Sequence, residues 1–138
     1  MKISDYFSLM PAVFEIKQLM GMISNEADRE ELAMLDKDRL STRSEIKEKV
    51  DRIVARQPVE IQDAYLGILR KKIAQDDEQY ETEIQELKEQ GAPQEVLEVK
   101  KQMHIFESDW SLSKQDAERM ETELVAALSK SERDLLSF

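Results

Sequence analysis

Two short stretches of this chain carry oxygen-bearing side chains at alternating positions, as the loops that bind hard cations do. They align at an offset of 71 residues. Acids stand at the first, third and tenth positions and a hydroxyl at the seventh: Asp36, Asp38, Thr42 and Glu45, then Glu107, Asp109, Ser113 and Asp116. The second stretch adds Ser111 at position 5 and Glu118 at position 12, where an EF-hand loop places its bidentate carboxylate. The pattern predicts a weak calcium or magnesium site, with the second stretch as the better candidate.

Both stretches depart from the EF-hand pattern at the sixth position, where a glycine normally allows a sharp turn. Ser41 and Leu112 stand there instead, and the twelfth residue of the first stretch is Lys47. The alternative interpretation is that the acids and hydroxyls only cap helix N-termini, where negative charge is stabilising. The sequence leaves both interpretations open.

The elements that must position these side chains are helices that begin directly after each stretch. Thr42 and Glu45 have the three-residue spacing of a capping box. The apolar residues that follow recur at helical spacing: Ile46, Val50, Ile53 and, beyond the Gln57–Pro58 hinge, Ile61. A similar start returns at Ser113 and Asp116. We therefore predict a duplicated helix–loop–helix scaffold.

The remaining helix start and stop signals predict an all-α single domain of about six helices spanning residues 1–138, with residues 1–31 as an N-terminal helical extension. One helix is expected from about Met10 to Ile23, with Pro11 in its first turn. A long central helix should run from Pro58 to Gln90 and end at Gly91. The apolar-free run 75–79 is a place where that helix could project, bend or break. A last capping box is predicted at Ser129 and Glu132.

Composition favours a binding protein over an enzyme. The chain has no cysteine and a single histidine, His104, so it lacks the residues for a thiolate nucleophile, a transition-metal site or a recognisable triad. We expect His104 to be a partly buried structural residue, and Trp110 to plug one end of the core. The net charge of −10 repels nucleic acids and anionic lipids, so we expect no nucleic-acid partner. No run approaches the length of a membrane span.

Several segments of this chain resemble segments of the SXP/RAL-2 family of nematode proteins and of its Ani s 5-like domain. They are the run Leu40-Ser41-Thr42-x-x-Glu45-Ile46, the Gln57–Pro58 hinge, the segment 108–113 and the closing Leu128-Ser129, Glu132 and Asp134-Leu135-Leu136. The resemblance covers roughly residues 32–138. It implies an all-α domain of about six helices, secreted and often antigenic, with a proposed capacity to bind divalent cations. The N-terminus lacks the apolar run of a secretory signal, so we expect secretion if the chain is processed and a cytoplasmic location if it is native as written.

The sequence therefore predicts a non-enzymatic helical binding protein with weak affinity for calcium or magnesium. One alternative is a carrier that buries a fatty acid or retinoid between amphipathic helices. Another is an interaction module that docks a protein partner, or a second copy of itself, through the first helix or an acidic arm. That arm, from Asp76 to Glu98, holds nine acids and one base.

Overall fold

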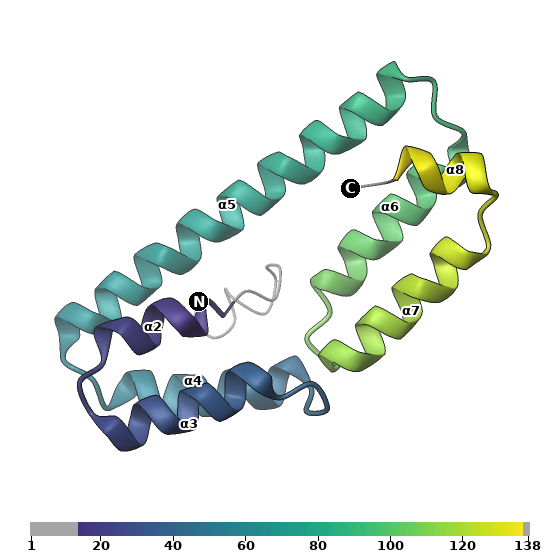
Figure 1. Cartoon of the computed structure of the whole chain (residues 1–138). Helices are drawn as coiled ribbons and strands as arrows, with labels where there is room; N and C mark the ends of the chain where they lie inside the picture. Colours follow the sequence, from purple (N-terminus) through teal and green to yellow (C-terminus); the bar gives the residue numbers. More distant parts are fainter. Residues whose placement is uncertain (1–13, 137–138) are drawn as a thin grey trace.

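The fold is built along one long helix, as the sequence predicts. The computed structural model describes residues 14–136, and in this range α5 spans Val59–Glu89, 31 residues or about 46 Å. It begins after Pro58 and ends before Gly91, whose φ of 73° is a conformation that glycine adopts without strain. The helix continues without a break through the apolar-free run 75–79 (Figure 1).

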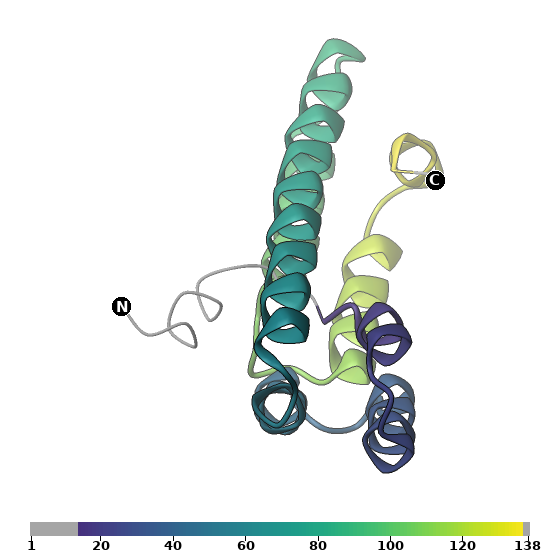
Figure 2. The same ribbon diagram turned by 90° about the vertical axis from the view of Figure 1, so that its left-hand side faces the viewer.

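A first group of helices packs on the N-terminal half of α5. It comprises α2 (Ile16–Met22), α3 (Glu26–Lys37) and α4 (Arg43–Ala55). Their shared core consists of Ile16, Leu19, Ile23, Leu32, Leu35, Ile46, Val50, Ile53, Tyr65, Leu69 and Ile73. Figure 2 shows α3 and α4 grouped at the N-terminal end of α5. Of the apolar residues at helical spacing after Thr42, Ile46, Val50 and Ile53 belong to this core, and Ile61 is partly buried against it.

A second, smaller group packs near the other end of α5. It comprises α6 (Gln94–Glu107), α7 (Lys114–Ala126) and α8 (Lys130–Leu135). The buried residues of its core are Leu87, Val96, Val99, Leu128 and Leu136. Between Ile73 and Leu87 the long helix buries no side chain, so α5 connects two separate cores.

Within residues 14–136, the helix that follows the predicted start at about Met10 begins at Ile16. Glu15 has a φ of 46°, a left-handed conformation that a continuing α-helix excludes, and α2 begins at the next residue. The earlier part of the predicted helix, with Met10 and Pro11, lies outside the described residues. The helix ends at Met22, and Asn25 then caps α3 by accepting a hydrogen bond from the amide of Asp28.

The predicted caps are present. Thr42 and Glu45 form a complete capping box at the start of α4, and Ser129 and Glu132 form another at the start of α8. Ser113 caps α7 by accepting from the Asp116 amide, 3.0 Å away. Each cap satisfies backbone donors that the first turn of a helix leaves free.

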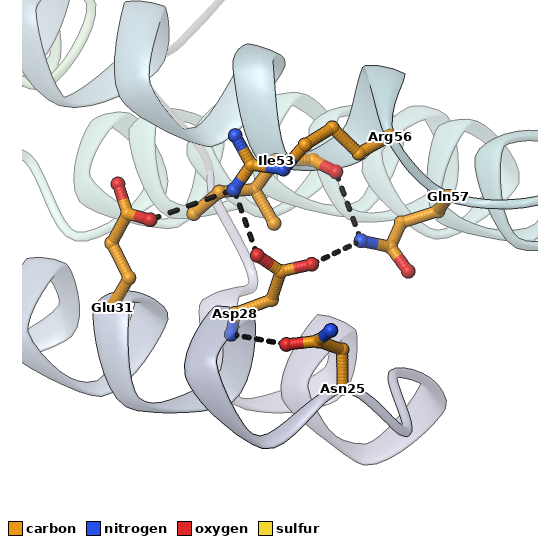
Figure 3. Close-up of polar contacts among 6 residues, drawn as sticks. All are labelled: Asn25, Asp28, Glu31, Ile53, Arg56 and Gln57. Atoms are coloured by element: carbon orange, nitrogen blue, oxygen red, sulfur yellow. Dashed lines mark hydrogen bonds and ion pairs between the residues drawn. The ribbon is translucent and has the colours of Figure 1, made fainter.

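A polar network fastens the N-terminal end of α3 to the C-terminal end of α4 (Figure 3). The Asp28 carboxylate accepts hydrogen bonds from Arg56 at 2.8 Å and from Gln57 at 2.9 Å. Gln57 also donates to the carbonyl of Ile53, at 3.0 Å. The Gln57 side chain therefore links the end of α4 to α3 just before the proline hinge.

The prediction of an all-α single domain with a long central helix and duplicated helix–loop–helix character is confirmed. Residues 14–136 form seven helices rather than about six, and they form no strand. None of the described helices combines the length and the apolar character that crossing a bilayer would need.

Candidate functional site

The two predicted loops lie against each other. Thr42 and Ser113 face one another in an isolated antiparallel bridge. The amide of Gln115 donates to the carbonyl of Arg39 at 3.0 Å, and the amide of Ser44 donates to the carbonyl of Trp110 at 2.9 Å. The two donors, Ser44 and Gln115, stand at equivalent positions of the 71-residue offset, and so do the two acceptors, Arg39 and Trp110. The two bonds are therefore related by an approximate two-fold arrangement. We call this region the loop junction, residues 36–45 and 107–118.

The acid at the third position of each loop, Asp38 or Asp109, plays the same local role. Asp38 Oδ1 accepts from the amides of Leu40 and Ser41, at 3.0 and 2.9 Å. Asp109 Oδ1 accepts from the amide and hydroxyl of Ser111, at 2.9 and 2.5 Å. Hydrogen bonds from Ser41 lower the pKa of Asp38, and those from Ser111 lower the pKa of Asp109. Each carboxylate is therefore ionised and stabilises the turn of its own loop.

Two arginines of the first loop bind groups in or next to the second loop. The Arg43 guanidinium donates to the carbonyls of Phe106 and Asp109, at 2.5 and 3.0 Å. Arg39 forms an ion pair with Glu118, so the carboxylate at position 12 of the second loop pairs with the first loop. The guanidinium of Arg43 is half-buried, and this burial lowers its pKa.

Glu121 on α7 completes the charged surroundings of the loop junction. Burial raises the pKa of its carboxyl, and the negative charges of Glu107 and Glu118 raise it further, against the opposing effect of Arg43. Glu107, Asp109 and Glu121 all act electrostatically on the half-buried guanidinium of Arg43.

Sequence reasoning missed Arg39, Arg43 and Glu121. One signal was available for Arg43, which occupies the first position of α4. A positive charge is unfavourable at a helix N-terminus because the helix dipole is positive there, so a basic residue at this position indicates a partner outside the helix. Glu121 carried no such signal, since it stands among other acids of an exposed helix.

The predicted metal ligands are only partly brought together. Within residues 14–136 no three His, Asp or Glu side chains are grouped so that they could hold a metal ion. Glu107 and Asp109 act electrostatically on Arg43, while Ser111 is bonded to Asp109 and Glu118 to Arg39. Asp36 and Asp38 line a separate cavity of about 400 Å³ beside the first loop. The calcium or magnesium site stays a prediction.

The aromatic residues singled out by the sequence have structural contacts. Trp110 packs against the first core and makes an edge contact with Phe14, with ring centroids 5.5 Å apart. The expectation that it covers an end of the core is confirmed. His104 is half-buried, as predicted, and stacks on Tyr80 of α5 with ring centroids 3.8 Å apart.

Comparisons of this chain with protein-family models, with curated proteins and with solved structures find no match.

Proposed function

We propose that this chain is a non-enzymatic helical binding protein of the SXP/RAL-2 type, which takes up calcium or magnesium weakly at the second loop. The observation that carries the proposal is the placement of two carboxylates of this loop, where Asp109 accepts from the amide of Ser111 and Glu118 pairs with Arg39 across the loop junction. Carboxylate oxygens are the ligands that hard cations prefer.

Weak affinity follows from the contacts that the acids already make. A cation that uses Glu118 must compete with Arg39, and one that uses Asp109 must share a carboxylate that also stabilises its own turn. Both contacts would have to be broken or shared when the ion binds. We therefore expect a dissociation constant of about 10⁻⁴–10⁻³ M, in the range of weak extracellular calcium modules.

The test is a titration of chelator-stripped protein with calcium and then magnesium, followed by calorimetry and by amide chemical shifts. Asp109→Asn and Glu118→Gln should abolish the saturable signal. Glu30→Gln, which removes an exposed acid on α3 outside both loops, is the matched control and should leave the signal unchanged.

A fourth variant tests the proposed competition between Arg39 and the cation for Glu118. Arg39→Gln frees Glu118 and should tighten binding about three- to fivefold, the range expected for releasing an exposed ion pair. Shift changes that do not saturate, or that are the same in all variants, would reduce both loops to helix caps.

A further inference from the structure

A shallow apolar groove runs between α6 and α7, away from the loop junction. Its volume is about 460 Å³. Its apolar lining comprises Val99 on α6 and Leu124, Ala127 and Leu128 at the end of α7. Val99 and Leu128 belong to the second core, so the edge of that core is exposed in the groove. The two helices form an adjacent pair in Figure 1.

The rim of this groove is acidic. Glu95 and Glu98 lie on the α6 side, and the other polar residues that line it are two glutamines. Among the described residues lining the groove, none carries a positive charge. An apolar floor with a one-sided charged rim is a common form of peptide-binding groove.

We propose that this groove, between α6 and α7, docks a basic amphipathic segment of a partner protein. Apolar side chains of the segment would rest on Leu124, Ala127 and Leu128, and its lysines or arginines would face Glu95 and Glu98. The net charge of −10 adds long-range attraction for such a partner.

The same features disfavour the other classes of ligand. Phosphate groups of nucleic acids and anionic lipids are repelled by the two glutamates on the rim. The carboxylate of a fatty acid is repelled as well, and an open groove leaves much of an acyl chain in water. A polypeptide with apolar residues at helical spacing and flanking bases fits both the floor and the rim.

The probe for the test is a synthetic, fluorescently labelled helical peptide with leucines spaced i, i+3, i+4 and i+7 and lysines elsewhere. A second peptide keeps the leucines and replaces every lysine by glutamate. Fluorescence anisotropy measures both affinities, and amide chemical shifts of the protein locate the binding surface. We expect the basic peptide to bind at least about tenfold more tightly and to shift residues of α6 and α7.

Paired variants distinguish binding at the groove from attraction to the overall negative charge of the protein. Glu95→Gln with Glu98→Gln should weaken the basic peptide about fivefold. Glu30→Gln with Glu81→Gln removes the same charge from exposed positions on α3 and α5 and should weaken binding much less, because only the long-range attraction is reduced. Equal weakening by the two pairs would overturn the proposal, because it would mean that only net charge matters.

A blocking variant tests the apolar floor. Ala127 is exposed, so Ala127→Phe places a ring in the groove without disturbing a buried position, and it should abolish peptide binding. Ala127→Arg adds a base at the same position and should weaken the basic peptide as well. Unchanged affinity in Ala127→Phe would overturn the proposal. So would light scattering that shows a wild-type dimer lost in this variant, since a second copy would then be the occupant.

Discussion

Thr42 and Ser113 face each other across an antiparallel bridge, and each is also the N-cap of a helix, α4 for the former and α7 for the latter. The N-termini of two helices therefore meet at one point. Their dipoles place partial positive charge there, and the acids of the two loops offset it. This junction joins two loops that are separated along the chain by α4, α5 and α6. A change at either cap should therefore affect both groups of helices.

Loss of the Thr42 cap should destabilise the whole domain. In Thr42→Ala the amide of Glu45 loses its hydrogen-bond acceptor at 3.2 Å. We expect the free energy of unfolding to fall by about 0.5–2 kcal/mol, measured by urea denaturation. Thr42→Ser keeps the hydroxyl and should retain most of the stability. A Ser variant as unstable as the Ala variant would show that the methyl group, and not the cap, matters.

Removal of the Arg43 guanidinium should loosen the loop junction. Arg43→Met keeps much of the side-chain volume but leaves the carbonyls of Phe106 and Asp109 without their donor. We expect a loss of about 1–3 kcal/mol in the free energy of unfolding, because charged donors make the stronger hydrogen bonds.

Trp110 supplies the spectroscopic readout for this variant. It is the only tryptophan of the chain, and it lies in the loop that Arg43 contacts. The fluorescence maximum of native Arg43→Met should shift to longer wavelength as its indole becomes more exposed. Arg43→Lys keeps the charge and one donor group. Its fluorescence maximum should fall between those of the wild type and Arg43→Met. A native spectrum identical to that of the wild type would contradict a role for Arg43 in holding this loop.

Glu121 should make stability fall as the pH rises. The pKa of its carboxyl is raised in the folded protein above the ordinary value of 4.5, so the folded state binds more protons than the unfolded state. The contribution of Glu121 is thus fully favourable below pH 4.5 and is lost as the pH rises through the raised value. Glu121→Gln should increase the melting temperature at pH 7, and its advantage over the wild type should shrink on acidification. An advantage that does not change with pH would exclude titration as the cause.

Asp28 should make stability rise as the pH rises, in contrast to Glu121. Hydrogen bonds from Arg56 and Gln57 hold the pKa of its carboxyl below the ordinary value of 3.8 (Figure 3). Its stabilising effect is present above that pH and is lost as the pH falls through the lowered value. Asp28→Asn should therefore be less stable than the wild type at pH 7, with the difference closing in acid. Thermal melts from pH 2 to 7 measure it, with the exposed-acid variant Glu30→Gln as the control. A stability difference between the wild type and Asp28→Asn that persists at low pH would indicate that the variant has lost packing contacts.

Local rules were enough to predict the helices of this chain. The capping spacing at Thr42 and at Ser129, the hinge at Pro58 and the stop at Gly91 each depend on residues a few positions apart, and the structure has all of them. The start of the first helix could not be predicted in the same way. Glu15 takes a left-handed conformation that its residue type gives no reason to expect.

The sequence by itself determined the all-α fold, the long central helix and the repeat at an offset of 71 residues. Only the tertiary structure decided what the repeat does, because helices α4, α5 and α6 lie between its two loops and contacts over such a separation leave no local pattern in the sequence. Folding sets Thr42 against Ser113, pairs Arg39 with Glu118, and places Arg43 on the carbonyls of Phe106 and Asp109. Among the acids that look like cation ligands along the chain, Glu118 is paired with Arg39 in the folded protein, and Glu107 and Asp109 act electrostatically on Arg43.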